Sequence, residues 1–502
     1  MQTSTAIKNQ PGAFPLAADH QQLPPTKHGG ASGILITRGA AIAMTGGLVA
    51  QGLKFLVILN VARHFAVAEF GLLSFAIAVN AYMFVISSFG LNVFGSRAVA
   101  QSGAVSAGLL AEVACLQGML ALAGLGCALS ALGFVPGISH LELRLIALFG
   151  LSNVIQAGLF DWVFQGLHRQ QVSAALNILW QGTWLGLTVT GIRLGLGVSA
   201  VPAALCASAF LAAAVGYCWM RRTVRIVPSV GQSMPLLIRS WQTLRSAAPL
   251  GWGTLLVTLI LWSDTVAVRL IQGERAAGWY AAGNRAALAV ATLSGFFVQG
   301  ALPALSRAGA ESPAQHNALF QHCYQDMALL FVPGCLWAIA YAREIVLLLF
   351  RRAEFLAAVP VFRVFQIMLL LAAISNLYGI GALVVLHRDR DYQRVLLLTA
   401  AVFLPACALL TTYYGILGAS LAALLGQCFS LCLFVRKTRS LLQLNHLAAL
   451  ALPLGAGLSM IVVGKFTGMG LGGSAALLLL AYCGLFAVRF WPRNQPQGAW
   501  SR

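Results

Sequence analysis

Acidic residues are scarce in this sequence: Asp and Glu together number 13 among 502 residues. Charged residues of both signs make up only 9% of the chain, whereas a typical soluble domain has about 25%. Hydrophobic residues make up 59%, so the chain lacks the polar surface that a soluble domain presents to water. This shortage of charge excludes an ordinary soluble protein and indicates an integral membrane protein.

The motifs of the common cofactor and metal sites are missing as well. The sequence contains no nucleotide-binding loop of the form GxxxxGKS or GxxxxGKT, no HExxH and no CxxC. Its ten cysteines lie singly in apolar stretches and its nine histidines are scattered, so neither has the spacing of a metal site. We therefore expect no cofactor, no metal and no catalytic residue, and we predict that the protein is not an enzyme.

Long apolar stretches follow one another from Arg38 nearly to the end of the chain. A helix that crosses a bilayer needs roughly 20 mostly apolar residues. The pattern therefore predicts an all-α membrane protein with about fourteen transmembrane helices. We expect these helices at residues 38–62, 72–94, 109–133, 143–167, 173–195, 199–220, 247–270, 280–303, 323–349, 358–386, 393–413, 415–435, 446–464 and 470–489.

Basic residues far outnumber acidic ones and give a net charge of +19. In a membrane protein such an excess is typical of cytoplasmic loops, because basic loops stay on the cytoplasmic side. The excess therefore does not indicate a nucleic-acid partner. With the N-terminus placed inside, most Lys and Arg fall on the cytoplasmic side, so we expect both termini in the cytoplasm.

Three segments do not have the pattern of membrane spans. Residues 1–37 are rich in Pro, Gly and Gln and lack an apolar core, so we expect a disordered N-terminal leader. Residues 221–246 are basic and rich in Pro and Ser, and we expect a cytoplasmic linker there. Residues 490–502 form the expected C-terminal tail.

A short internal repeat predicts two related lobes. The stretch "GLNVFGSRA" from Gly90 matches "GALPALSRA" from Gly300, each at the inner end of the second expected helix of its half. We expect a six-helix N-lobe at 38–220 and a six-helix C-lobe at 247–435. An even number of spans in each lobe relates the two by an axis along the membrane normal, with a cleft between them. The last two helices, 446–489, lie outside the repeat and are expected to be accessory.

Three stretches carry a resemblance to a known family. They are "LNVARHFAVAEFGLLSFA" from Leu59, "DWVFQGLHRQQVSAALNI" from Asp161 and "SDTVAVRLIQGERAAGWYAAGNRAALAV" from Ser263. With them the sequence resembles the oligosaccharide flippases of the polysaccharide-transporter family. That family belongs to a superfamily shared with multidrug and toxin extruders and with lipid II flippases. The resemblance covers roughly residues 38–440.

This resemblance implies a transport function. The implied substrate is an undecaprenyl-diphosphate-linked oligosaccharide repeat unit, moved to the outer leaflet of the bacterial inner membrane for surface polysaccharide, exopolysaccharide or lipopolysaccharide synthesis. The implied partners are this lipid, the membrane lipids, and a polysaccharide polymerase with its export machinery. A lipid II flippase and a cation-coupled multidrug extruder are alternatives. A membrane-embedded glycan polymerase is disfavoured because the expected outer loops are short.

Two opposite charges are expected at one depth in adjacent spans. Asp264 lies about six residues before the outer end of its helix and Arg285 about six residues into the next, which places both roughly 9 Å below the boundary. A charge in the middle of a span costs about 2.5–3.5 kcal/mol. Two interpretations are open: a buried ion pair between the helices, or an Arg285 that faces the cleft while Asp264 orients it or titrates during transport. Asp264 is therefore a candidate coupling or gating residue.

Lys54 has no acidic residue within helical reach and lies too deep in the first span for its side chain to reach the surface. We expect it in a cavity, with Gln51 close to the same face one turn earlier. Lys54 and Arg285 are the leading candidates for binding an anionic lipid-linked sugar, because fixed cations in a wet cleft offset the hydration that a diphosphate loses. Asn284 is a candidate for binding sugar hydroxyls.

Asp161 lies near the inner end of the fourth expected span. It is either an interfacial carboxylate among Trp162, His168 and Arg169, or a gating or coupling group. Both interpretations stay open from the sequence.

Overall fold

The computed structural model describes residues 38–227, 236–442 and 446–490. These residues form sixteen α-helices, one 3-10 helix, one π-helix and one pair of very short strands. The helices all belong to the unit Ile36–Arg502. The described residues do not include the expected leader, residues 1–37. Of the expected tail, 490–502, they include only residue 490.

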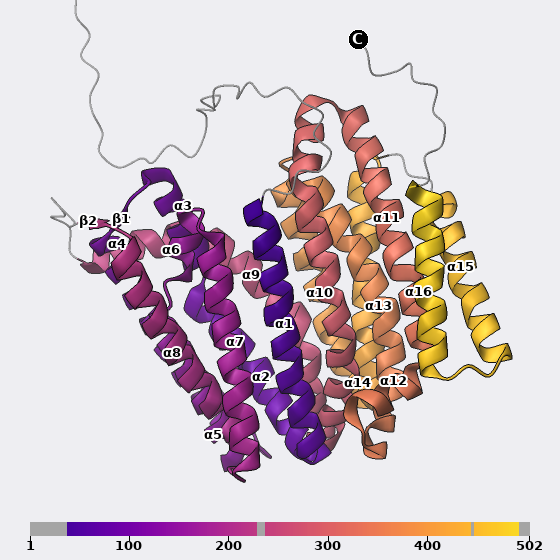
Figure 1. Cartoon of the computed structure of the whole chain (residues 1–502). Helices are drawn as coiled ribbons and strands as arrows, with labels where there is room; N and C mark the ends of the chain where they lie inside the picture. The colour runs from indigo at the N-terminus through magenta and orange to yellow at the C-terminus, as the bar shows by residue number, and fades with distance from the viewer. Residues whose placement is uncertain (1–37, 228–235, 443–445, 491–502) are drawn as a thin grey trace, which may run out of the picture. The chain divides into compact units, whose positions relative to one another are not determined.

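Helices α1 to α8 form the N-terminal half, drawn in indigo to magenta in Figure 1. They are α1 (Arg38–His64), α2 (Val67–Ser88), α3 (Leu91–Ser102), α4 (Ala107–Gly133), α5 (His140–Gln156), α6 (Asp161–Gly166), α7 (Gln170–Arg193) and α8 (Ala200–Thr223). Strand β1 (Val105–Ser106) pairs in parallel with β2 (Ile226–Val227). Helix α7 packs between α1 and α8, and α5 contacts α2, α4 and α8.

Helices α9 to α16 form the C-terminal half. They are α9 (Leu236–Gln272), α10 (Glu274–Glu311), α11 (Pro313–Ala340), α12 (Ala342–Phe350), η1 (Ala353–Ala358), α13 (Val359–Asn376), η2 (Leu377–Val384), α14 (Asp389–Thr438), α15 (His446–Phe466) and α16 (Leu471–Phe490). Helix α9 packs on α14, and α13 packs on α10 and α14. Helix α15 packs on α11 and α16. The two halves meet where α2 contacts α9 and α10.

The expectation of an all-α membrane protein is confirmed. Nine helical segments within the described ranges are long and apolar enough to cross a membrane. All fourteen expected ranges fall on helical segments, but the number of membrane crossings stays a prediction. Helix α9 begins at Leu236, inside the expected linker 221–246, because its first turns continue the seventh expected span.

Irregular backbone occurs inside one expected span and between two others. The second expected span is divided into α2 and α3 at Phe89 and Gly90, whose φ angles are 26° and 78°. Only glycine adopts such a φ at no steric cost, so Gly90 permits the turn. Helix α14 contains Gly415 with φ 59° and ψ −140°, at the position where the eleventh and twelfth expected spans meet.

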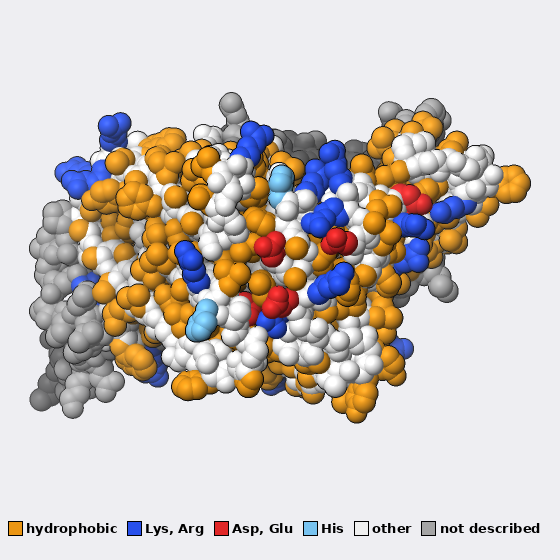
Figure 2. Space-filling model, turned by 90° about the horizontal axis from the view of Figure 1, so that it is seen from below, with side chains coloured by type: hydrophobic (Ala, Val, Ile, Leu, Met, Phe, Trp, Pro, Cys, Tyr) orange, Lys and Arg blue, Asp and Glu red, His pale blue; other side chains and the backbone are white. Residues whose placement is uncertain are grey.

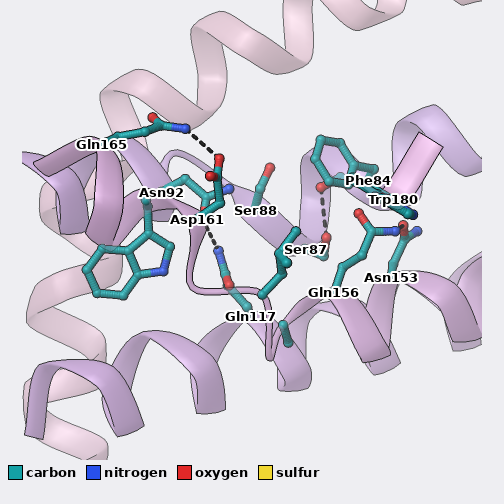
Figure 3. Close-up of a pocket in the computed structure, with 13 residues that line it drawn as sticks. Phe84, Ser87, Ser88, Asn92, Gln117, Asn153, Gln156, Asp161, Gln165 and Trp180 are labelled. Carbon is teal, nitrogen blue, oxygen red and sulfur yellow. Dashed lines mark hydrogen bonds between the residues drawn. The ribbon is translucent and has the colours of Figure 1, made fainter. Parts of the chain in front are cut away.

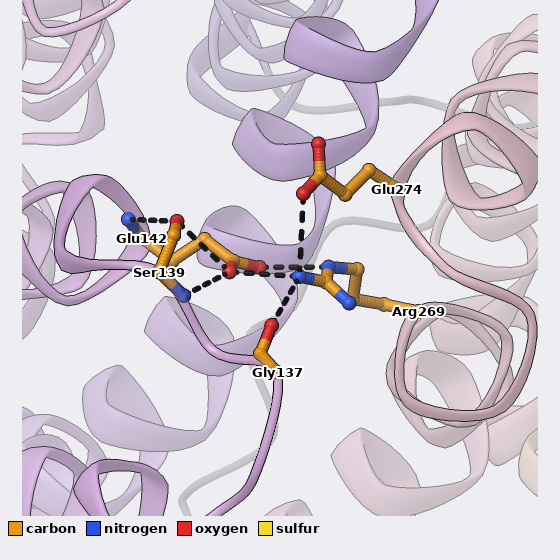
Figure 4. Close-up of polar contacts among 5 residues, drawn as sticks. All are labelled: Gly137, Ser139, Glu142, Arg269 and Glu274. Atoms are coloured by element: carbon orange, nitrogen blue, oxygen red, sulfur yellow. Dashed lines mark hydrogen bonds and ion pairs between the residues drawn. The ribbon is translucent and has the colours of Figure 1, made fainter.

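Charged side chains of both signs gather near the centre of the face seen from below in Figure 2, and hydrophobic side chains surround them. The ion pair of Arg269 with Glu142 joins the two halves and is buried on both sides. The guanidinium of Arg269, near the end of α9, donates from Nε and Nη2 to the two carboxylate oxygens of Glu142 at 2.7 and 2.8 Å. Nη2 also donates to the carbonyl of Gly137 at 3.2 Å and lies 3.8 Å from Glu274 (Figure 4). Glu142 also accepts from the backbone N–H of Ser139, so one carboxylate caps α5 and pairs with α9.

Removing one partner of this pair is expected to destabilise the protein by about 3–5 kcal/mol, because a buried charge is then left unpaired. We expect Arg269→Met and Glu142→Leu each to lower the midpoint of thermal unfolding, measured on the detergent-solubilised protein. The double variant should recover most of the loss. Independent, additive losses would contradict the pairing. Glu354→Gln, which removes the exposed pair with Arg352, is the control and should change stability by less than about 1 kcal/mol.

Helices α2 and α10 approach each other closely through two glycines. A Cβ atom at Gly71 would collide with the backbone oxygen of Glu274, and one at Gly278 with that of Val67. Small residues allow such backbone contact between membrane helices, where packing rather than the hydrophobic effect favours association.

Gly278→Ala is therefore expected to push α2 and α10 apart and to destabilise the protein by about 1–3 kcal/mol. The thermal unfolding midpoint measures this effect. Gly186→Ala is the matched control, because a Cβ there meets nothing within 4 Å. The close contact would be refuted if both variants were as stable as the parent.

Candidate functional site

Asp264 is buried among hydrogen-bond donors in the C-terminal half. It lies on α9 and is only 3% exposed. Its Oδ2 accepts a hydrogen bond from the hydroxyl of Tyr280 on α10 at 2.7 Å. Its Oδ1 accepts from the backbone N–H and the hydroxyl of Thr265 at 2.5 and 3.1 Å. Both carboxylate oxygens therefore have partners that stabilise a charge in an apolar surrounding.

Arg285 lies on α10 and is 9% exposed. Its guanidinium carbon is 4.1 Å from the centre of the Trp262 ring on α9, a cation–π contact. Its Nη2 atom is buried and has no hydrogen-bond partner. Asp264 attracts it electrostatically, but the hydrogen bonds of that carboxylate go to Tyr280 and Thr265. The direct ion pair that the sequence left open is therefore not formed between these two described residues.

Lys54 is close enough to Arg285 for the two cations to repel each other. Lys54 lies on α1, which contacts α10, and its side chain is partly buried. None of the described carboxylates forms an ion pair with it. Gln51 lies one turn earlier on α1 and is exposed. The structure thus brings Lys54 and Arg285, the two leading candidates for binding an anion, into one electrostatic neighbourhood.

Asn284 faces a different space from its neighbour Arg285. Consecutive residues of an α-helix point about 100° apart. Asn284 is 3% exposed and lines a small pocket with Asp264, Thr399 and Gln427, between α9, α10 and α14. Its Oδ1 atom is buried without a hydrogen-bond partner. Asn284 and Arg285 therefore do not present one continuous binding surface.

Asp161 lines a pocket that contains none of the other candidate residues. It is the first residue of α6 and lines a polar pocket together with residues of α2, α3, α4, α5 and α7 (Figure 3). Its Oδ2 accepts from the side-chain amide of Gln165 at 2.6 Å. Of the expected interfacial neighbours, Trp162 also lines this pocket. The site residues predicted from the sequence thus divide between two places.

Four residues that hold or pair with buried charges were given no such role from the sequence. Tyr280 and Trp262 hold the charged groups of the C-terminal half, but an aromatic residue in a membrane helix has no sequence signal that distinguishes this role from packing. Glu142 could have been found, because "SHLE", Ser139 to Glu142, is a capping-box pattern. Arg269 lies in the last turn of α9, where an arginine is usually exposed, yet it is 6% exposed.

The arrangement around Arg285 suits an anion. Two cations lie near each other, and the nearby carboxylate of Asp264 is engaged by its own donors. Because Nη2 of Arg285 is buried and unpartnered, an additional acceptor there would be favourable. The described residues contain no group of three or more His, Cys, Asp or Glu side chains that could hold a metal ion.

Solved membrane transporters share this fold. A lipid II flippase, MurJ, in an inward closed conformation superimposes with a TM-score of 0.71 at 11% identity, covering 90% of this chain and 99% of that one. A MATE protein in complex with MaL6 gives a TM-score of 0.53 at 13% identity, covering 82% and 98%. A transporter of the MOP superfamily from Pyrococcus furiosus gives 0.52 at 14% identity, with coverage of 82% and 98%. At these identities the likeness concerns the fold.

Sequence comparison identifies the family. No curated protein shows a significant sequence match to the chain. A family model described as "Polysaccharide biosynthesis protein" matches residues 36–308. This range covers more than half of the 502 residues and contains all six candidate site residues. It also contains the three stretches on which the resemblance to polysaccharide transporters was based. The chain belongs to this polysaccharide biosynthesis family, on a fold shared with MOP-superfamily transporters.

Proposed function

We propose that this protein is a flippase that moves an undecaprenyl-diphosphate-linked oligosaccharide across the bacterial inner membrane. The observation that carries the proposal is the surplus of positive charge at Lys54 and Arg285. The two side chains repel each other, and the nearby carboxylate of Asp264 accepts its hydrogen bonds from Tyr280 and Thr265. An anionic headgroup would relieve this repulsion.

The physical task of such a flippase is to carry a diphosphate through about 30 Å of hydrocarbon. Losing water around an ionised group is very costly unless fixed groups replace it. Lys54 and Arg285 would supply two such groups from helices of different halves. Trp262 would hold the guanidinium in place while Nη2 binds a phosphate oxygen, and Gln51 would extend the polar face of α1.

Transport would proceed by alternating exposure of this cationic region to the two sides of the membrane, as the two expected lobes move relative to each other. Asp264 is the candidate coupling group, because its protonation would change the charge that attracts Arg285. We place both termini in the cytoplasm, following the distribution of basic residues. The polysaccharide polymerase and its export machinery would take up the product at the outer leaflet.

Two alternatives differ in the charge or identity of the substrate. A cation-coupled extruder of cationic drugs would need a site with net negative charge, which the pairing of Lys54 with Arg285 does not favour. A lipid II flippase carries a related lipid-linked diphosphate, so the same cations would suit it. Membership of the polysaccharide biosynthesis family supports the oligosaccharide substrate over lipid II.

Lys54→Ala and Arg285→Ala are each expected to lower the rate of surface polysaccharide production at least about tenfold, because each removes a charged contact worth about 1.5–3 kcal/mol. Protein abundance should stay at the level of the parent. Surface glycan is measured by immunoblot in a strain that lacks the chromosomal gene. Lys465→Ala is the control, because Lys465 is an exposed lysine of α15 that lies over Tyr341. Full glycan output from either site variant would exclude that residue from the site.

The charge of the ligand that the protein binds distinguishes the flippase function from the drug-extruder function. A ligand that binds only the folded protein raises the unfolding midpoint. We expect undecaprenyl diphosphate to stabilise the detergent-solubilised protein, and ethidium, a cationic dye, to have no effect. Stabilisation by ethidium together with no response to the diphosphate would favour the extruder. Lys54→Ala should abolish the response to undecaprenyl diphosphate.

A further inference from the structure

The polar pocket of the N-terminal half lies where two membrane helices are interrupted. Helix α2 ends at Ser88 and α3 begins at Leu91, and α5 ends at Gln156 and α6 begins at Asp161. Residues on both sides of both interruptions line the same pocket (Figure 3). Irregular backbone within a membrane is tolerated only where protein or a wet cavity satisfies it. In transporters such interrupted helices commonly form binding sites.

The pocket is lined by carboxamides rather than by cations. The amide of Gln117 on α4 donates to Asn92 Oδ1 on α3 at 2.7 Å. The amide of Gln156 on α5 donates to Asn153 Oδ1 at 3.4 Å. None of the lining residues is Lys, Arg or His. The pocket therefore lacks the positive charge that would hold a diphosphate. It does have hydrogen-bond donors and acceptors side by side.

Two polar atoms in this pocket are buried without a partner. Oδ1 of Asp161 has no hydrogen bond, and neither has Nε1 of Trp180 on α7. The first is an acceptor and the second a donor. A buried polar atom without a partner is unfavourable, so a ligand that both donates and accepts would complete the site. A hydroxyl group does both.

The volume of this pocket is also larger than one bound water molecule requires. The cavity measures about 150 Å³, roughly ten times the smallest cavity that holds a water molecule. Trp180 adds the flat apolar face of an indole beside its polar N–H. Carboxamides, one carboxylate and an indole together match a neutral ring that carries several hydroxyl groups.

The pocket and Lys54 are connected by two packed helices. Trp180 of the pocket lies on α7, and α7 packs along α1, the helix of Lys54. A lipid-linked oligosaccharide carries both a diphosphate and sugars, so one substrate could contact both helices.

We propose that this pocket binds a neutral sugar of the lipid-linked substrate, with Asp161 accepting from a hydroxyl and Trp180 donating to one. The proposal rests on the proposed flippase function and adds a second subsite to it. It assigns Asp161 to substrate contact rather than to gating. The amides of Asn92, Gln117 and Gln156 complete the ring of donors and acceptors.

The test compares the affinity of the purified full chain for two lipids. One is the lipid-linked oligosaccharide extracted from the producing cells, and the other is undecaprenyl diphosphate without sugar. We expect the unmodified protein to bind the sugar-bearing lipid more tightly. Trp180→Phe keeps an aromatic ring and removes the N–H, and Asp161→Asn keeps the shape and removes the charge. Each should weaken binding of the sugar-bearing lipid about tenfold and leave binding of undecaprenyl diphosphate unchanged. Trp241→Phe, at a tryptophan that is 67% exposed, is the control.

Three results would overturn the pocket assignment while leaving the flippase function intact. They are equal affinity of the unmodified protein for both lipids, unchanged binding in both pocket variants, and an equal loss for both lipids. An equal loss would indicate a structural role for the pocket. If the unmodified protein bound neither lipid, both the flippase function and the pocket assignment would be wrong. Unfolding midpoints of the variants identify any loss that comes from misfolding.

Discussion

The contact between the guanidinium of Arg285 and the ring of Trp262 is the interaction on which the candidate site depends. It holds a buried cation against an aromatic face, and Nη2 of the guanidinium is left without a hydrogen-bond partner. Asp264 is near, but its oxygens are occupied by Tyr280 and Thr265. The site keeps a surplus of positive charge because Lys54 and Arg285 are two cations and Asp264 is one carboxylate.

The same protein also contains a buried arginine that is fully paired. Arg269 meets both oxygens of Glu142, which is completely buried, and this pair links α5 to α9. Such a closed ion pair has little capacity for another ligand, whereas Lys54 and Arg285 repel each other and gain by binding an anion. All these residues are charged and lie within apolar helices, but they differ in their partners. The carboxylate bound to Arg269 indicates a structural role, and the absence of such a partner at Arg285 among the described residues indicates a binding role.

Much of the fold could be predicted from the sequence, because apolar length and the shortage of charge determine where membrane helices form. Lys54 and Arg285 could be singled out as candidates, because a charge inside an apolar span is costly and needs a partner or a cavity. The partners of the buried polar groups depend on three-dimensional packing and could not be predicted. Which partner takes the carboxylate of Asp264 depends on where the hydroxyl of Tyr280 lies, and sequence spacing does not determine this. The pocket at Asp161 was missed because its amides come from helices distant in sequence, where each alone looks like a helix-joining residue.

A structure of the protein with undecaprenyl diphosphate bound, determined by electron cryomicroscopy in lipid nanodiscs, tests the central claim most directly. The account predicts phosphate oxygens within hydrogen-bonding distance of both the Lys54 ammonium and the Arg285 guanidinium, with Trp262 still against the guanidinium. A diphosphate bound away from both cations, or an Arg285 that turns to pair with Asp264 while the lipid is bound elsewhere, would contradict it.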